Sequence, residues 1–321
     1  MALRWCRRIR LLCSRLQRRM SNADLTCFFR LLEFLFRRVL GRILICLVYG
    51  ILTFMTFIVI TLVLPYENLH NPLWYTSVLA VVALYLMTNI VYHYIKATAT
   101  HPGTPAKSSE LPQCRYCLNH KPERVHHCAI CNECIVKMDH HCIWVNQCVG
   151  AQNHRHFFQF LTFLVTGCAT YMIAGFRTFY YNYWRANTNQ MFCASDLTYL
   201  PWYEKFCDNG GEFIVSSVFF SYFLCVLVFI FVGGLCYWNF VLISSGQTYV
   251  GVLKRGIEKH AFIQLIFCPL RNTGFTNHWK RFLGLNQSIT IVRHILLPSA
   301  HRAYAYENYL TSDSLTNITV L

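Results

Sequence analysis

The sequence predicts an all-α integral membrane protein with four transmembrane helices and a small cysteine-rich domain between the second and third helices. The 321 residues are 55% hydrophobic and 13% charged, and this charged share is about half that of an average soluble domain. Length alone would allow two or three soluble domains. The chain instead contains several uninterrupted apolar runs of about twenty residues, the length that crosses a bilayer as a helix.

Four stretches are long and apolar enough to span a membrane as helices, in which every backbone polar group is bonded within the segment. They are residues 43–64, 73–95, 157–180 and 213–243. Prolines and small polar residues at 65–72 and 100–105 mark the exits of the first two spans. We therefore divide the membrane part into helices 1 and 2 (43–95) and helices 3 and 4 (157–243).

The first 42 residues form a basic segment ahead of the first span. They contain eleven Arg and no Lys, which is too basic for a cleavable secretory signal. We expect an amphipathic cytosolic segment with Arg37, Arg38 and Arg42 at the lipid headgroups. A mitochondrial targeting sequence is the alternative interpretation of such an Arg-rich start.

Basic residues alternate between the segments that connect the spans. The counts of Lys plus Arg are eleven in 1–42, none in 65–72, seven in 96–156, two in 182–212 and eight in 244–321. By the positive-inside rule, both termini and the central segment 96–156 lie in the cytosol, and loop 182–212 lies in the lumen. The formal net charge of +15 is therefore mostly a consequence of topology, and it does not indicate nucleic-acid binding.

Seven of the seventeen cysteines fall between Cys114 and Cys148, together with five histidines. Such crowding is typical of metal binding rather than of disulfides. Zinc prefers four tetrahedral ligands, and a C-x2-C pair supplies two of them from one tight turn. Two such pairs occur, Cys114 with Cys117 and Cys128 with Cys131. Two Cys3His sites are complete if Cys134, Cys148, His127 and His141 supply the remaining ligands. Because a short cytosolic loop builds no large core, we expect two zinc ions to supply much of its folding free energy.

Two such sites leave one of the seven cysteines unused. Cys142 follows Asp139, His140 and His141 directly, so a carboxylate, an imidazole and a thiol lie within four residues. A nucleophilic thiol needs a base that removes its proton and a third group that orients the base. We assign these roles to Cys142, His140 and Asp139, with His141 left to bind metal. In the alternative interpretation Cys142 is a metal ligand and Asp139-His140 is a solvated turn.

The cysteine-rich segment resembles the DHHC protein S-acyltransferases over about forty residues. The resemblance rests on the order of the cysteines and on Lys121-Pro122-x-Arg124, His126-His127-Cys128, Asp139-His140-His141-Cys142, Trp144, Asn146, Cys148-Val149-Gly150 and Asn153. It implies that Cys142 accepts the acyl group, with His140 as base and Asp139 as its orienting carboxylate. It also implies that one zinc is held by Cys114, Cys117, His127 and Cys134, and the other by Cys128, Cys131, His141 and Cys148.

The reaction implied by the resemblance consists of two thioester exchanges. The Cys142 thiolate attacks a long-chain acyl-CoA such as palmitoyl-CoA, CoA leaves, and a cysteine thiol of a membrane-associated protein then takes the acyl group. The expected partners are therefore acyl-CoA, proteins with juxtamembrane cysteines and the lipid bilayer. The number of spans and the lack of an export signal favour the endoplasmic reticulum or Golgi, with the plasma membrane as the alternative.

Two further groups of residues are candidates for binding acyl-CoA. Lys121, Arg124 and His126 are placed to meet the CoA phosphates, although solvated loop charges or lipid contacts explain them equally. One leaflet is roughly 15 Å thick, or about ten helical residues, so an acyl tail that enters at His156 ends near Gly167. Gly167 is then the closed end of the acyl cavity, or else it permits close helix packing.

The chain departs from the family pattern at two places that bear on the site. Position 143 is Ile, where the family usually has Pro after the catalytic cysteine. After the fourth helix, Thr248-Tyr249-Val250-Gly251 stands where the family has Thr-Thr-x-Glu. A bond from the second position of this motif toward Asp139 would have to come from Tyr249 or be absent.

Two other functions compete with acyl transfer. A membrane-anchored zinc scaffold or ubiquitin-ligase-like adaptor also fits eight Cys and His ligands, but it leaves Asp139-His140 unexplained. An acyltransferase-like protein with little turnover is consistent with the missing acid at Gly251. In the lumenal loop, Cys193 and Cys207 lie in an oxidising compartment and form a disulfide or stay unpaired.

Overall fold

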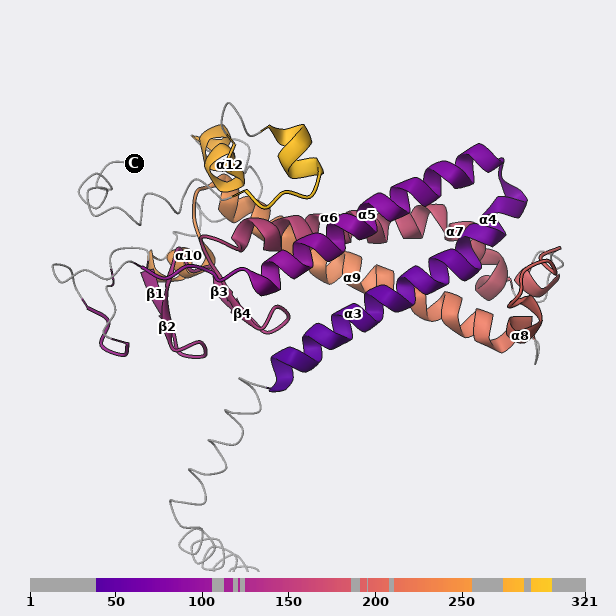
Figure 1. Ribbon diagram of the computed structural model, residues 1–321, viewed down its shortest axis with the longest axis horizontal. Helices are drawn as coiled ribbons and strands as arrows, with labels where there is room; N and C mark the ends of the chain where they lie inside the picture. The colour runs from indigo at the N-terminus through magenta and orange to yellow at the C-terminus, as the bar shows by residue number, and fades with distance from the viewer. Residues whose placement is uncertain are drawn as a thin grey trace, which may run out of the picture.

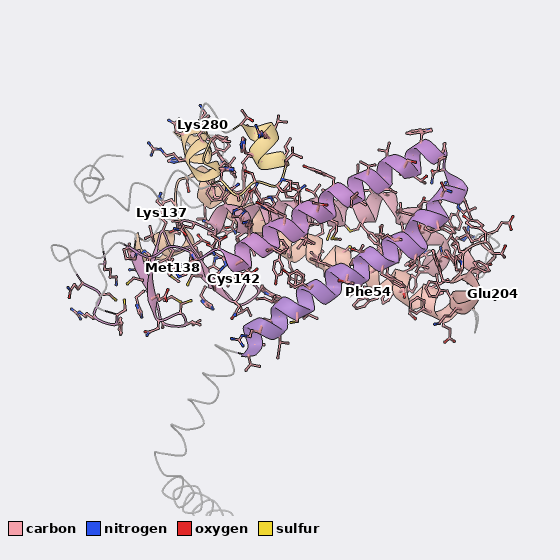
Figure 2. All side chains as sticks on the ribbon, viewed as in Figure 1. Phe54, Lys137, Met138, Cys142, Glu204 and Lys280 are labelled. Atoms are coloured by element: carbon pink, nitrogen blue, oxygen red, sulfur yellow. A yellow bond between two sulfur atoms is a disulfide. The ribbon has the colours of Figure 1, made fainter. Side chains whose placement is uncertain are left out.

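The computed structural model describes residues 39–105, 113–117, 121, 125–185, 191–194, 196–207, 211–255, 274–285 and 290–301. Long helices run through most of this part of the chain, and two small hairpins lie at one end of them (Figure 1). We call this the hairpin end, and we call the opposite end, where α8 lies, the disulfide end. Figure 2 labels Cys142 at the hairpin end and Glu204 of α8 at the disulfide end.

Four helical segments are long and apolar enough to cross a membrane, as the sequence predicts, and the chain is a multi-pass membrane protein. The helices that form them are α3 (Gly41–Ile58) continued by η2 (Val59–Val63) and α4 (Leu64–His70), α5 (Leu73–Ala99), α6 (His154–Ala174) and α9 (Glu212–Ser244).

The first span is longer than expected, because Pro65 does not end it. Proline removes one backbone N–H and crowds the carbonyl four residues earlier. Here a π-helical turn, Val59–Val63, directly precedes α4, and Pro65 occupies the first turn of α4, where its missing N–H costs least. The helix therefore continues to His70.

The third span is interrupted earlier than the predicted residue 180. Helix α6 ends at Ala174, and Gly175 joins it to α7 (Phe176–Phe179) and the π-helix η3 (Tyr180–Trp184). The buried Glu67 carboxylate of α4 accepts hydrogen bonds from the Thr178 hydroxyl at 2.7 Å and from its backbone N–H at 3.2 Å. This pairing holds α7 against the first span.

The helices pack unevenly. Helix α5 packs along α6, and α6 packs along α9, whereas α3 makes sparser contacts with α9. One of these contacts is the edge-to-face pair of Phe54 and Phe220, whose ring centroids are 5.7 Å apart. One buried apolar cluster lies near the hairpin end and includes Cys142, Tyr94 and Phe157. A second cluster lies near the disulfide end.

The cysteine-rich segment folds as two antiparallel hairpins. The first pairs β1 (Val125–Cys128) with β2 (Glu133–Val136), and the second pairs β3 (His140–Cys142) with β4 (Gln147–Val149). Their turns contain Asn132 and Asn146, both with positive φ, a conformation that asparagine tolerates better than most residues.

Short elements after the fourth span return to its hairpin end. These are α10 (Tyr249–Arg255), α12 (Phe275–Leu283) and η7 (Val292–Leu296). Trp279 of α12 donates its indole N–H to the Ser244 hydroxyl at 3.1 Å. The buried Arg155 guanidinium donates to the carbonyls of Ser299 and His301 at 3.1 and 2.6 Å, which ties the chain after η7 to α6.

Cys193 and Cys207 form a disulfide. The sequence left open whether these two thiols are bonded or unpaired, and the structure shows them bonded. Cys193 lies in the 3-10 helix η4 (Phe192–Ala194), and Cys207 ends α8 (Tyr203–Cys207). The Tyr203 hydroxyl also donates to the Cys193 carbonyl at 2.8 Å. Together these bonds fold the connection between the third and fourth spans over the disulfide end.

Replacing Cys193 and Cys207 together by Ser should lower the free energy of unfolding by about 3 kcal/mol, because the bond closes a loop of about fifteen residues. The measurement is thermal unfolding in detergent, where the variant should melt earlier. Cys46→Ser, which removes an exposed free thiol on α3, is the control and should not change the midpoint. An unchanged midpoint in the double variant would contradict a stabilising role for the disulfide.

Candidate active site and metal centres

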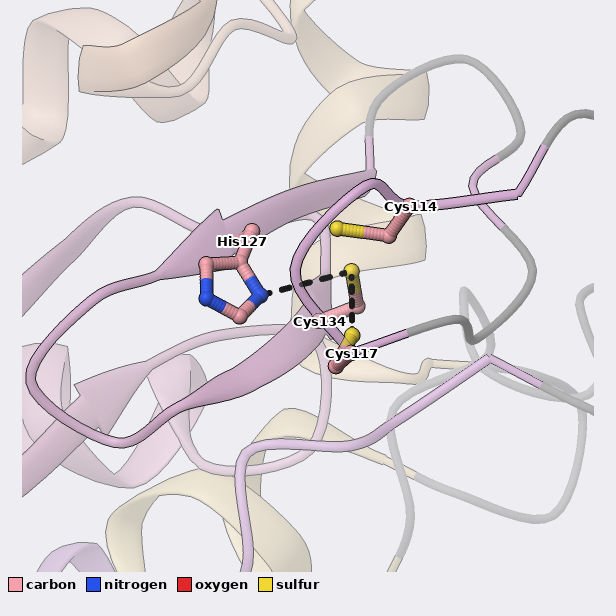
Figure 3. A group of neighbouring side chains, drawn as sticks. All are labelled: Cys114, Cys117, His127 and Cys134. Atoms are coloured by element: carbon pink, nitrogen blue, oxygen red, sulfur yellow. Dashed lines mark hydrogen bonds between the residues drawn. The ribbon is translucent and has the colours of Figure 1, made fainter.

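The first cysteine–histidine group joins the β1–β2 hairpin to the chain before it (Figure 3). Its members are Cys114, Cys117, His127 and Cys134. His127 and Cys134 are direct cross-strand partners in β1 and β2, so the sheet register itself brings the two side chains together. The Cys134 Sγ lies 3.5 Å from the Cys117 Sγ and 4.0 Å from the His127 Nδ1.

The second group joins the two hairpins to each other. It consists of Cys128, Cys131, His141 and Cys148. His141 and Cys148 are again direct cross-strand partners, in β3 and β4, whereas Cys128 and Cys131 lie at the turn of the β1–β2 hairpin. The His141 Nδ1 lies 3.4 to 3.7 Å from the three sulfur atoms.

Both groups fit zinc. Zinc–sulfur bonds of about 2.3 Å and zinc–nitrogen bonds of about 2.0 Å in a tetrahedron separate the ligand atoms by roughly 3.5 to 3.8 Å. The observed separations lie close to this range, and within each group all ligand atoms lie within 4.8 Å of one another. Three thiols and one imidazole form a donor set that suits zinc. The eight residues are those that the sequence analysis assigned to the two zinc sites.

Strand geometry separates the metal group from the neighbouring catalytic candidates. Successive side chains of a strand point to opposite faces, so in β3 the side chains of His140 and Cys142 share one face and His141 has the other. His141 lies in the second metal group. His140 instead packs edge-to-face against Phe157 of α6, with ring centroids 5.3 Å apart, and Cys142 belongs to the apolar cluster among the helices.

Asp139, His140 and Cys142 form a connected group of side chains. The His140 Nδ1 lies 2.8 Å from the Asp139 Oδ2, and since an ionised carboxylate only accepts, Nδ1 carries the proton of this bond. Cys142 also interacts with the His140 side chain closely enough to raise its pKa, and Nε2 is the ring nitrogen that Asp139 leaves free. Asp139 is 1% exposed and Cys142 is 8% exposed. Neither metal group includes Cys142.

The bond from Tyr249 toward Asp139 that the sequence analysis left open is present. The Tyr249 backbone N–H donates to the Asp139 Oδ1 at 2.8 Å, so both carboxylate oxygens of Asp139 have a partner. Because the donor is the main chain, the side chain at position 249 does not supply this bond. That explains how a tyrosine can stand at this position of the family motif.

The charges of this group reinforce one another. Burial by itself raises the pKa of Asp139, but the nearby His154, the His140 hydrogen bond and the Tyr249 N–H together bring that pKa below its ordinary value. Burial lowers the pKa of His140, but the hydrogen bonds and charges of Asp139 and Cys142 outweigh it and raise the pKa to about 9. The Asp139 carboxylate therefore lies buried beside a protonated His140 imidazole.

The β3–β4 hairpin is fixed to the ends of the helices by polar contacts. The Gln147 amide donates to the carbonyls of Ala97, Thr98 and Thr100 at 2.6 to 3.0 Å, where the last turn of α5 leaves carbonyls without helical partners. The Tyr94 hydroxyl donates to the Trp144 carbonyl at 2.8 Å. These contacts place Cys142 at the boundary between the hairpins and the helices (Figure 2).

An apolar cavity of about 450 Å³ extends from Cys142 between the helices. Side chains of α3, α5, α6 and α9 line it, including Leu52, Ile90, Leu161 and Val228. Gly167 lies in its wall, where an added Cβ would come 3.3 Å from Ile90 Cδ1. The lining continues beyond Gly167 to Gly175, about 12 Å further along α6 at 1.5 Å per residue.

Two of the three cationic candidates lie in the described part of the chain, and Arg124 lies outside it. Burial and the charges of Lys254 and Lys121 lower the pKa of His126 to about 4. His126 is therefore neutral at pH 7, and positive charge near it comes from Lys121 and Lys254. Sequence reasoning did not select Lys254, because its position is set by the return of α10 to the hairpins.

Gln147 was also missed. A glutamine in a strand has no periodicity or spacing that marks it, and its partners lie about fifty residues earlier. The only available signal is the end of α5, whose free carbonyls require donors from elsewhere in the fold.

Comparison with known proteins agrees with the geometry of the site. The family model described as DHHC palmitoyltransferase matches residues 107–256. The chain is 35% identical over 227 residues to Palmitoyltransferase ZDHHC16 of Bos taurus, which covers 66% of this chain and 59% of the bovine protein. It is 27% identical over 196 residues to Palmitoyltransferase pfa3 of Neurospora crassa, which covers 54% of this chain and 28% of the fungal protein.

A longer match is to Palmitoyltransferase ZDHHC16B of Danio rerio, at 30% identity over 310 residues, 88% of this chain and 80% of the fish protein. The chain spans less than two thirds of the length of the mammalian relatives. The fish relative, however, is covered along most of its length and the family model includes both metal groups and Cys142. The chain belongs to the DHHC palmitoyltransferase family.

Proposed function

We propose that the protein is a protein S-acyltransferase that forms an acyl thioester at Cys142 and passes the acyl group to cysteines of membrane-associated proteins. The observation that carries this proposal is the position of one thiol. Cys142 lies outside both metal groups, beside the Asp139–His140 pair, and at one end of an apolar cavity between membrane helices. A metal-binding scaffold or ubiquitin-ligase-like adaptor needs neither the pair nor the cavity.

The residues of the site have the following roles in the reaction. His140 holds the proton that leaves the Cys142 thiol, as an imidazolium whose Nδ1–H is bound by Asp139. The thiolate attacks the acyl-CoA carbonyl carbon, the bond to the CoA sulfur breaks, and CoA leaves as the thiol after taking up a proton. A substrate thiol, deprotonated in the same way, then attacks the Cys142 thioester and restores the free thiol. Both steps exchange one thioester for another, so the intermediate is neither too stable nor too unstable to react onward.

The cavity is the proposed site of the acyl tail. Burying each methylene contributes roughly 0.8 kcal/mol, so a palmitoyl or similar chain favours the apolar space behind Cys142 while its carbonyl stays beside the thiol. Because the lining continues past Gly167 to Gly175, we assign Gly167 to the wall of the tail site rather than to its closed end. For the CoA phosphates we propose the cations Lys121, Arg124 and Lys254, with the neutral His126 as a hydrogen-bond donor.

The two zinc ions have a structural role in this account. The eight ligands hold the β1–β2 and β3–β4 hairpins in one unit, and zinc bound there supplies folding free energy. No step of the acyl transfer requires the metal to touch substrate. The second site adjoins the catalytic group through the chain, because His141 lies between His140 and Cys142.

We further propose that the hairpin end and both termini face the cytosol, in the endoplasmic reticulum or Golgi. The basic segments 1–42, 96–156 and 244–321 support this orientation. The Cys193–Cys207 disulfide supports it as well, because it lies at the opposite end, where an oxidising lumen would be. Segment 96–156 is then the cytosolic zinc domain and 182–212 the lumenal loop.

Cys142→Ala should abolish thioester formation with an alkyne-tagged palmitoyl-CoA analogue and leave the zinc content at two per chain. The reason is that the variant removes the acyl acceptor without touching a metal ligand. Hydroxylamine-sensitive labelling and metal analysis of the same sample make the measurement, and Cys46→Ser is the control. Undiminished labelling of Cys142→Ala would contradict the assignment of the nucleophile, and absence of labelling in the wild type would favour the scaffold function.

Tyr249→Pro should slow acylation of Cys142 about ten-fold to a hundred-fold, because it removes one hydrogen bond to a buried carboxylate. Proline is tolerated at the first residue of a helix, and Tyr249 begins α10. Tyr249→Ala keeps the N–H and is the matched control, with a rate close to that of the wild type. Single-turnover labelling gives both rates; equal loss in the two variants would show that the tyrosine side chain matters instead.

His127→Ala should lower the zinc content of the purified protein from two per chain toward one, since it removes a ligand of the first group. The neighbouring His126→Ala removes a histidine outside both groups and should keep two zinc ions. Elemental analysis by mass spectrometry measures the content. Loss of zinc in His126→Ala, or full retention in His127→Ala, would contradict the assignment of ligands.

A further inference from the structure

The cavity behind Cys142 opens toward the side of the helices as well as toward the hairpins. Of the side chains that line it, three are largely exposed: Trp144 at 49%, Phe231 at 72% and Leu235 at 40%. A side chain that lines a cavity and is also exposed must lie at its rim. Trp144 belongs to the β3–β4 turn beside Cys142, but Phe231 and Leu235 lie one turn apart on α9.

The α9 part of the rim lies inside the bilayer. Asn239 of α9 pairs with His154, the first residue of α6, at 3.1 Å. Phe231 is eight residues further toward the disulfide end, about 12 Å at 1.5 Å per residue. One leaflet of hydrocarbon is roughly 15 Å thick, so the opening beside Phe231 faces acyl chains of lipids rather than water.

Helix α3 borders the same part of the cavity. Val48 and Ile51 of α3 line it near the hairpin end. Toward the disulfide end, the ring pair of Phe54 and Phe220 brings α3 against α9. We call the opening bounded by Val48 and Ile51 on α3 and by Phe231 and Leu235 on α9 the lateral slot.

On its other sides the cavity is bounded by the remaining helices. Helices α5, α6 and α9 pack against one another in sequence. Between α3 and α5, the side chains of Leu52 and Met87 line both the cavity and a shallow groove on the outer surface. These two residues therefore lie between the cavity and that groove.

A lateral opening matters because of where an acyl-CoA molecule lies. Its tail is dissolved in the leaflet and its CoA group lies at the surface, so the tail must move from lipid into the cavity. If the tail has to pass through water on its way into the cavity, each exposed methylene lowers the population of tails in passage about four-fold. A path that keeps the whole tail in apolar surroundings is therefore faster, and the advantage grows with chain length.

We propose that the lateral slot is the route by which the tail of a membrane-dissolved long-chain acyl-CoA enters the cavity. The proposal rests on the proposed function, because it concerns the same cavity and the same acyl donor. The tail slides between α3 and α9 within the leaflet facing the hairpins while its thioester stays level with Cys142. No covalent step is added to the reaction.

The test compares loading from two donors in the full-length protein reconstituted in phosphatidylcholine vesicles. Leu235→Trp narrows the slot, and Ile230→Trp places the same bulk on a lipid-exposed part of α9 that does not line the cavity. The measured quantity is the ratio of Cys142 loading rates for palmitoyl-CoA and for the more water-soluble octanoyl-CoA. Leu235→Trp should lower this ratio about ten-fold, because only the longer tail depends strongly on an apolar path.

Two control variants distinguish entry through the lateral slot from entry between α3 and α5. Ile230→Trp should keep the wild-type ratio. Thr53→Trp, which adds bulk to the groove between α3 and α5, should also keep it. An unchanged ratio in Leu235→Trp would overturn the proposal, and so would a lowered ratio in Thr53→Trp alone, which would place the route between α3 and α5.

A second measurement separates this inference from the proposed function. In the Cys142→Ala background no thioester forms, and a palmitoyl-CoA analogue with a photoreactive diazirine in its chain reports entry alone. Brief illumination at successive times should label peptides that line the cavity, more slowly in Leu235→Trp than in Ile230→Trp. Labelling with this difference would support the slot even if Cys142 proved not to be acylated, whereas equal labelling rates would overturn it.

Discussion

The structure of the site depends on the cross-strand pair of His141 and Cys148, which places two ligands of one metal group on the same short hairpin. Zinc bound there joins β3 and β4 to the turn of the first hairpin. Because side chains alternate along a strand, fixing His141 on the metal face fixes His140 and Cys142 on the face toward the helices. The order Asp-His-His-Cys therefore places a member of the metal group, His141, between two side chains that face the helices.

The same hairpin is held from its other side by the membrane helices. Gln147 satisfies carbonyls at the end of α5, and Tyr94 binds the carbonyl of Trp144. At the start of α3, Gly41 lies against the Asn146 side chain so closely that a Cβ would overlap it. Cys142 is thus positioned between the second metal group and the helices, where it lines the apolar cavity.

The four spans and the set of eight metal-group residues could be predicted from the sequence for physical reasons, whereas the division of the eight between two groups came from the family resemblance. Apolar length alone defines a membrane helix, and the C-x2-C spacing constrains which thiols share a metal. The continuation of the first helix through Pro65 could not be predicted, because a π-helical turn before the proline accommodates it. The end of α6 at Ala174, six residues before the expected limit of the third span, had no clear signal in an apolar run.

The members of the candidate site could be named from the sequence, but the contacts that hold them in place could not. Asp139, His140 and Cys142 are neighbours in the chain, so sequence alone brings them together. The amide of Tyr249 and the side chain of Gln147 reach the site only through tertiary structure, over 110 and about fifty residues. A main-chain donor also has no residue type that would reveal it. The depth of the cavity beyond Gly167 likewise depends on how four helices diverge.

The decisive question is whether Cys142 accepts an acyl group while both zinc sites stay occupied. Native mass spectrometry of the detergent-solubilised protein after addition of palmitoyl-CoA, combined with peptide mapping of the acylated residue, answers it. We expect one particle that carries a palmitoyl group on Cys142 and still holds both zinc ions, because the acylated sulfur belongs to neither metal group. An acyl group that appears only with loss of a zinc ion, or on a cysteine other than Cys142, would contradict this expectation.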